Sequence, residues 1–267
     1  MAKNHPSRKV GLIGFDNTVK LFGDGSEENP EVIRDDSVLG DEDKIKQVAA
    51  QSAQRCMQNS VSDAEIKLIK LIDKLSPGGC TALGPAVLSA AVLAGNGKPG
   101  SQVIICTDGM ANVGLGQFRN YGGDANDEQA NRFYDMVGKF AQEKGVAISI
   151  ISIIGDECNL NTLSRMAEFT GGNVERVDPI QLKNNVVNLM TEPIIATNVV
   201  AKIKLHKGLC FRNEDPANLQ ENETMMVRLL GNVSKQTEIT FEYTLKKIRE
   251  LAKMEDVDFE KLTHLPF

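Results

Sequence analysis

The sequence predicts an α/β protein: a doubly wound, mostly parallel sheet followed by an antiparallel β segment. Three predicted strands, at residues 102–107, 146–154 and 173–177, alternate with helical patterns between residues 78 and 190. This order is typical of a parallel sheet with helices on both faces. After Pro193, strand-like runs follow one another without intervening helices, which indicates antiparallel pairing.

The N-terminal part predicts a hairpin and one helix. Apolar runs at 10–15 and 19–22 flank a tight Asp16-Asn17 turn, and the acidic, glycine-containing stretch 24–43 predicts a surface loop around a short strand at 31–33. Ser62 and the acidic residues after it predict the start of a helix that ends at Pro77-Gly78. Its apolar positions have helical spacing: Ile66, Ile69, Leu71, Ile72 and Leu75.

The central part supplies the remaining elements of the sheet. Pro85 suits the start of a helix whose small apolar residues span 86–94, and the continuous apolar run 102–107 predicts a buried strand. An amphipathic helix is expected at 126–144, followed by a β-branched central strand at 146–154. We then expect a helix at 160–169 that ends before Gly171-Gly172, a strand at 173–177 and a last helix at 179–190.

The C-terminal part predicts strands at 198–205, 225–230 and 238–245, which suit part of a β-sandwich. We therefore divide the chain into an α/β domain at 1–193, incomplete at its N-terminus, and a β-rich segment at 194–267.

Composition and charge exclude several classes of protein. The 267 residues carry a formal net charge of −6, so the chain has no basic footprint for nucleic acid. No apolar run approaches the roughly 20 residues of a membrane span, and the first residues lack the apolar core of a signal peptide. The five cysteines are scattered without a C-x-x-C pair and have apolar or strand-like neighbours, which indicates buried thiols in a reducing compartment. We expect a cytoplasmic protein.

Two motifs point to one edge of the sheet. The glycine-rich loop 77–84 carries Thr81 and opens a helix, and the strand 103–107 runs into Asp108. A hydroxyl and a carboxylate at this edge suit Mg²⁺ or Mn²⁺. The alternatives are that Thr81 caps the helix and that Asp108 is a turn residue.

These motifs, together with the runs 10–15 and 145–148, resemble the von Willebrand factor A family over roughly residues 9–192. The resemblance implies a Mg²⁺ site in which Thr81 and Asp108 are ligands and an acidic group of a partner completes the shell. We expect further partner contacts along the same edge, from Gly79, Cys80, Thr107, Gly109 and Asp156.

The sequence departs from that family at its start. The family's first strand, with its Asp-x-Ser-x-Ser loop, should precede Val10, yet only nine residues do so. We therefore expect a chain that lacks a central strand and is a fragment of a longer protein. The β-rich tail resembles the β-sandwich attached to the trunk of COPII inner-coat subunits.

The sequence thus favours an intracellular protein-binding module that recognises a partner at the sheet edge, with an incomplete Mg²⁺ site. The alternative is a scaffold or coat-type subunit of COPII-like vesicle transport that assembles without metal. We do not expect an enzyme, because no nucleophile or general base is suggested near Asp108 and the loop lacks the Gly-Lys-Ser/Thr ending of a P-loop.

Overall fold

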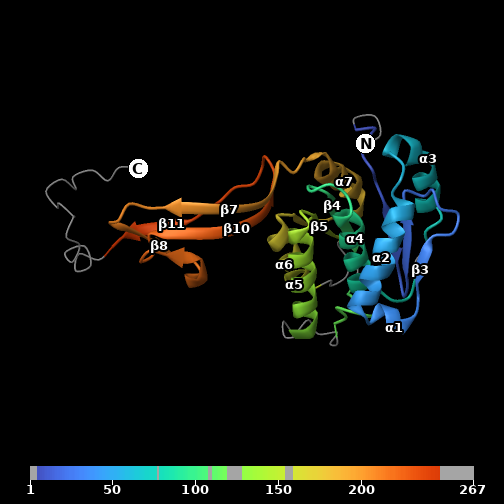
Figure 1. Ribbon diagram of the computed structural model, residues 1–267, viewed down its shortest axis with the longest axis horizontal. Helices are drawn as coiled ribbons and strands as arrows, with labels where there is room; N and C mark the ends of the chain where they lie inside the picture. The colour runs from blue at the N-terminus through green and yellow to red at the C-terminus, as the bar shows by residue number, and fades with distance from the viewer. Residues whose placement is uncertain (1–4, 77, 108–109, 119–127, 154–158, 247–267) are drawn as a thin grey trace. The chain divides into compact units, whose positions relative to one another are not determined.

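The computed structural model describes residues 5–76, 78–107, 110–118, 128–153 and 159–246 (Figure 1). The chain divides into two units, which we describe separately. The first comprises residues 1–199 and 230–236, and the second comprises residues 200–229 and 237–267. The expected division at 193/194 stays a prediction.

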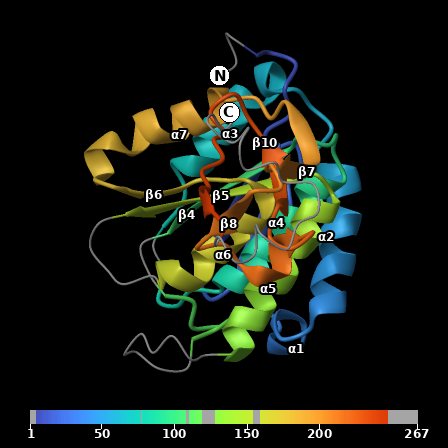
Figure 2. The same cartoon turned by 90° about the vertical axis from the view of Figure 1, so that its left-hand side faces the viewer.

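The first unit contains two three-stranded sheets. β1 (Leu12–Phe15), β2 (Val19–Gly23) and β3 (Glu31–Ile33) pair antiparallel in the order β1-β2-β3. β4 (Gln102–Thr107), β5 (Ala147–Ile153) and β6 (Val174–Val177) pair parallel in the order β4-β5-β6, side by side in Figure 2. The predicted α/β class with a parallel sheet is confirmed, but the described strands form two sheets rather than one.

Seven α-helices accompany these sheets in the described part of the first unit. They are α1 (Asp36–Leu39), α2 (Glu42–Cys56), α3 (Val61–Ile72), α4 (Leu83–Gly95), α5 (Glu128–Glu143), α6 (Leu160–Thr170) and α7 (Leu182–Thr191), the last preceded by a 3₁₀ turn at Pro179–Gln181. All the helices that the sequence predicts are present, whereas α1 and α2 are additional. The sequence does carry a signal for α2, because Asp41 caps its first turn and Ile45, Ala49 and Ala53 recur at helical spacing.

Helix α4 is at the centre of the core. It contacts α2, α5, β1 and β4. Ten of its thirteen residues are buried, so it is apolar on nearly every side. Val87 and Leu88 of this helix share one buried cluster with Val103 and Ile105 of β4. The small residues of its sequence allow this close packing on all sides.

Helix α3 differs from the expectation. Its buried residues are Val61, Ala64 and Leu68, whereas four of the five predicted apolar positions are exposed and the fifth, Leu71, is half-buried. The exposed fractions are 69% for Ile66, 51% for Ile69, 53% for Ile72 and 45% for Leu75. The helical periodicity was therefore informative about the helix but wrong about which face is buried.

The second unit is built on antiparallel pairs. β8 (Leu209–Arg212) pairs with β11 (Glu242–Leu245), and β9 (Leu219–Gln220) pairs with the start of β10 (Met225–Val233). β7 (Ala196–Lys204) pairs with β10 on its other side. This confirms the expected antiparallel segment, although β8 and β9 are additional and β11 covers only the end of the predicted strand 238–245.

Tyr134 provides a test of the core. Its ring is fully buried, with centroids 5.3 Å from Phe133 and 6.0 Å from Phe118. Its hydroxyl has no hydrogen-bond partner among the described residues, and burial raises the pKa of this phenol. Because a buried unpaired hydroxyl costs free energy, Tyr134→Phe should stabilise the protein by about 1 kcal/mol in urea unfolding. A clear loss of stability would instead show that the hydroxyl has a partner.

Candidate functional site

Three segments that are distant in sequence meet at the N-terminal end of α4. The main-chain N–H of Ala82 donates to the carbonyl of Asp16, just after β1, at 2.7 Å. The N–H of Thr81 donates to Oδ1 of Asn112 at 2.7 Å, and the N–H of Asn112 donates to the carbonyl of Thr81 at 3.0 Å. The structure thereby brings the threonine loop next to the end of β1 and to the chain that follows β4.

The predicted site residues have different surroundings. Gly79 and Cys80 are exposed, and a Cβ on Gly79 would meet nothing within 4 Å. Thr81 is half-buried, whereas Thr107 is buried at the end of β4, opposite Ser152 of β5. The other three predicted residues, Asp108, Gly109 and Asp156, lie outside the described residues.

The helix-cap alternative for Thr81 is wrong. The N-cap position of α4 is occupied by Ala82, which has no side chain to accept a capping hydrogen bond. The first turn is instead held by the main-chain bonds to Asp16 and Asn112. Asn112 is a site residue that the sequence did not reveal, because one asparagine in an irregular loop has no periodicity that would single it out.

The described part of this edge does not fit a Mg²⁺ ion. The carboxylate of Asp16 accepts bonds from the N–H and the hydroxyl of Thr18, both at 2.8 Å, and pairs with Nζ of Lys20 at 2.9 Å. Burial opposes ionisation, but the bonds from Lys20 and Thr18 outweigh it and lower the pKa of Asp16.

This carboxylate therefore already has a cationic partner. Moreover, no group of three or more His, Cys, Asp or Glu side chains within the described ranges could hold a metal ion. Ligation by Thr81 and Asp108 stays a prediction.

The exposure of the cysteines differs from the expectation that all of them are buried. Cys56 is buried as expected, and burial raises its pKa, but Cys80 and Cys106 are exposed and Cys210 is half-buried. Cys106 lies in a strand whose apolar character suggested burial on both faces. It is exposed because the strand's inward face holds Val103 and Ile105 instead.

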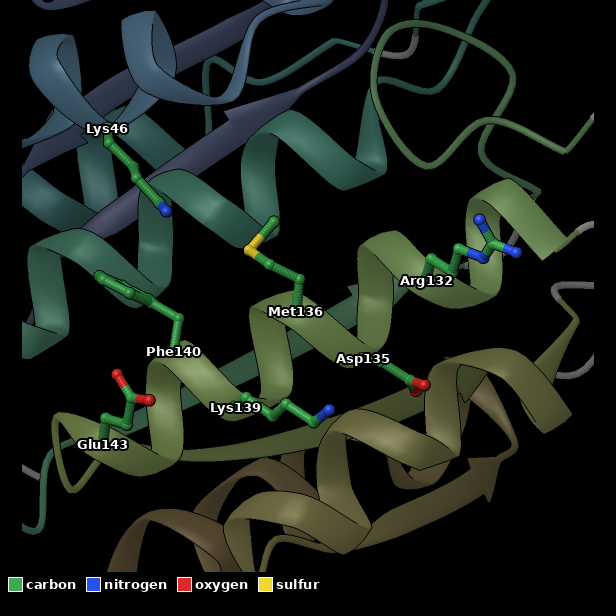
Figure 3. A pocket seen from close by; sticks show the side chains of 7 residues that line it. All are labelled: Lys46, Arg132, Asp135, Met136, Lys139, Phe140 and Glu143. Carbon is green, nitrogen blue, oxygen red and sulfur yellow. The ribbon is translucent and has the colours of Figure 1, made fainter.

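A groove lined by residues of α2 and α5 has a volume of about 410 Å³ (Figure 3). Its lining is Lys46, Arg132, Asp135, Met136, Lys139, Phe140 and Glu143. Lys46 lies 5.0 Å from the ring centroid of Phe140 and pairs with Glu42 at 2.5 Å. Arg132 and Asp135 are likewise paired, with Glu128 and Arg165. Three of the five charged side chains that line the groove are therefore held in surface ion pairs.

Comparison with known proteins decides the family. The family model of the Sec23/Sec24 trunk domain matches residues 1–192. The chain belongs to the Sec23/Sec24 trunk domain family. This match covers the α/β part of the chain and supports a resemblance to the trunk of COPII inner-coat proteins. The resemblance of the tail to their β-sandwich and the von Willebrand factor A assignment stay predictions.

Two individual proteins are also similar to this Sec23/Sec24 trunk chain. "Circularly permutated Ras protein 1" of Dictyostelium discoideum is 32% identical over 241 residues, which are 90% of this chain and 27% of that protein. The crystal structure of the human COPII-coat protein Sec24c matches with a TM-score of 0.55 at 13% identity, over 89% of this chain and 33% of that one. This second similarity shows the fold alone. The chain thus spans about a quarter of the first protein and a third of the second.

Among the described residues of this trunk chain, no helix is both long and apolar enough to cross a membrane.

Proposed function

We propose that the chain is a structural subunit of a COPII-like coat, which acts in the cytoplasm by binding other coat proteins rather than by catalysis. The family match over residues 1–192 carries this proposal. The likeness of the fold to Sec24c supports it.

The chemistry of the described sheet edge also supports a scaffold. The polar groups there bind one another: Thr81 with Asn112, and Asp16 with Thr18 and Lys20. Such bonds fix the geometry of a surface but leave no activated nucleophile or metal-binding cluster in the described part of the edge. Assembly through this protein's surfaces should therefore need no divalent cation.

The test is association with purified coat subunits of the Sec23 and Sec24 type, measured by sedimentation velocity. We expect a defined complex with at least one of them and no turnover of nucleotide by the chain itself. A chain that is folded, by far-UV circular dichroism and cooperative unfolding, but sediments alone with both subunits would contradict the proposed function.

A further inference from the structure

Helix α5 carries a row of charged residues along the groove of Figure 3. The four members of this charged row alternate in sign from the N-terminal to the C-terminal end of the helix: Arg132, Asp135, Lys139 and Glu143. Their spacing of three, four and four residues keeps them on one face of the helix. The row extends over about 16 Å, which is three turns of helix.

Two half-buried apolar side chains lie beside the charged row. Met136 and Phe140 pack on the main buried cluster and also line the groove, on the side of α5 that faces Lys46 (Figure 3). Asp135 and Lys139 lie on the opposite flank of the helix. An apolar strip with charges along one side is typical of a helix face that packs against another helix.

Three of the four charges are available to a binding partner. Arg132 pairs with Glu128 at 2.9 Å, but the two side chains are 80% and 78% exposed, so water weakens this pair. Lys139 and Glu143 form no ion pair with any residue that the structure describes. The ammonium group of Lys139 lies over the ring of Phe169, 5.6 Å from its centroid.

Asp135 is the one member of the row that is firmly paired. Its two carboxylate oxygens accept from the guanidinium of Arg165 on α6, each at 2.5 Å. A carboxylate has about four acceptor positions, so a further cation can bind Asp135 without displacing Arg165.

The order of signs is complementary to itself when the direction of the helix is reversed. We consider a second copy of α5 that is antiparallel to the first, related by a two-fold axis level with the midpoint of residues 137 and 138. Arg132 then lies opposite Glu143 of the second copy, and Asp135 lies within one residue, about 1.5 Å along the helix, of Lys139 of the second copy. The two-fold axis repeats each contact, so four pairs of opposite charge form.

The apolar residues fit the same arrangement. A two-fold axis that lies in the plane of contact and perpendicular to the helices keeps like flanks of the two copies together. The charges therefore meet charges on one side, and Met136 meets Phe140 of the second copy on the other. A parallel arrangement would instead place each charge opposite itself.

We infer that the groove along α5 is a site of self-association, in which a second copy of this chain binds with its α5 antiparallel to the first. The contact involves one face of one three-turn segment, so the dimer should be weak, with a dissociation constant of the order of 100 µM. This inference goes beyond the proposed coat function and does not depend on it, because it concerns the chain alone.

Exchange of the terminal charges tests the pairing. Arg132→Glu and Glu143→Arg each place like charges opposite one another at both ends of the dimer, so each variant should dissociate at least about tenfold more readily than wild type. The double variant with both substitutions should regain the wild-type dissociation constant within about threefold, since each end again carries opposite charges. An equimolar mixture of the two single variants should likewise form a mixed dimer.

Sedimentation velocity of the whole chain measures these constants, at concentrations from about 10 to about 500 µM, which bracket the expected value. Lys67→Glu on α3 is the matched control, because Lys67 is exposed and the substitution changes the net charge as Arg132→Glu does. This control should leave the dissociation constant within about twofold of wild type. Urea unfolding of every variant shows whether the fold is kept.

A wild-type chain that stays monomeric over this range would overturn the inference. The same holds if Arg132→Glu and Lys67→Glu weaken the dimer equally, or if neither the mixture nor the double variant restores it. Failure of the proposed function is distinguishable: a chain that dimerises but joins no coat subunit contradicts the proposed function alone, and a chain that joins coat subunits but stays monomeric by itself contradicts the self-association alone.

Discussion

Gly84→Ala should lower the free energy of unfolding by about 3 kcal/mol, whereas Gly79→Ala should change it by less than about 0.5 kcal/mol. Gly84 lies in the first turn of α4, where a Cβ would be 1.9 Å from the carbonyl oxygen of Leu115 and 2.9 Å from the ring of Phe133. The better helix propensity of alanine, about 1 kcal/mol, cannot offset a collision with main-chain atoms.

The loop that carries Leu115 cannot simply move away. The N–H of Leu115 donates to the carbonyl of Leu39 at 2.9 Å, and the N–H of Phe118 donates to the carbonyl of Ala111 at 2.9 Å. Displacement of this loop would also strain the Asn112–Thr81 pair at the site. Urea unfolding of the two variants checks the prediction, with Gly79→Ala as the matched control because its Cβ would point into open space. Equal stability of both variants would show that α4 and the loop are not packed as described.

Asp24→Asn should lower the free energy of unfolding by about 3 kcal/mol at pH 7, because it weakens several hydrogen bonds to a fully buried carboxylate. This carboxylate accepts from the N–H groups of Ser26, Gln58 and Asn59 at 2.9, 2.8 and 2.6 Å. It thereby joins the end of β2 to the connection between α2 and α3. An amide in the same place would turn either a weaker acceptor or a second donor toward these N–H groups.

The cost of Asp24→Asn should depend on pH. Burial raises the pKa of Asp24, but the bonds from Ser26, Asn59 and Gln58 outweigh burial and lower it below the usual 3.8. A folded-state pKa below the unfolded one contributes stability that is present above the unfolded value and is lost as the pH falls through the folded one.

Urea unfolding at pH 7, 5 and 3 checks this prediction. The difference in the free energy of unfolding between wild type and Asp24→Asn should be at its full value at pH 7 and 5 and smaller at pH 3. The control is Asp35→Asn, at the exposed N-cap of the short helix α1, which should lower the free energy of unfolding much less. A difference that is constant with pH would contradict the ionised, hydrogen-bonded state of Asp24.

Hydrophobic periodicity was sufficient for the alternating elements of the α/β part. The runs that became β4 and β5 are apolar and rich in β-branched residues, which is typical of strands covered on both faces, and the helices α5 and α6 have one apolar stripe. The α3 face could not be predicted in the same way. Which stripe of a helix is buried depends on what packs against it, and Ile66 and Ile69 have no such neighbour in the described structure.

The site was harder to predict than the fold, because its hydrogen bonds join segments that are distant in sequence and most of them involve main-chain groups. The sequence singled out Thr81 through its glycine-rich loop, but the groups that hold this loop are the carbonyl of Asp16 and the side chain of Asn112. Of the five cysteines predicted to be buried, Cys80 and Cys106 are exposed, because burial of a small thiol depends on tertiary neighbours.

We propose that this trunk-domain chain works as a scaffold that assembles without metal. The most direct measurement is the dissociation constant for a Sec23- or Sec24-type coat subunit, first in Mg²⁺ and then in excess EDTA. A Mg²⁺ concentration of about 5 mM is chosen so that weak Mg²⁺ sites are saturated. Asp108→Ala serves as the variant at the predicted metal ligand. We expect the dissociation constants of the wild type and of Asp108→Ala to agree within about twofold, both in Mg²⁺ and in EDTA. Binding that requires Mg²⁺ and is lost in Asp108→Ala would contradict it and would restore metal-dependent recognition at the sheet edge.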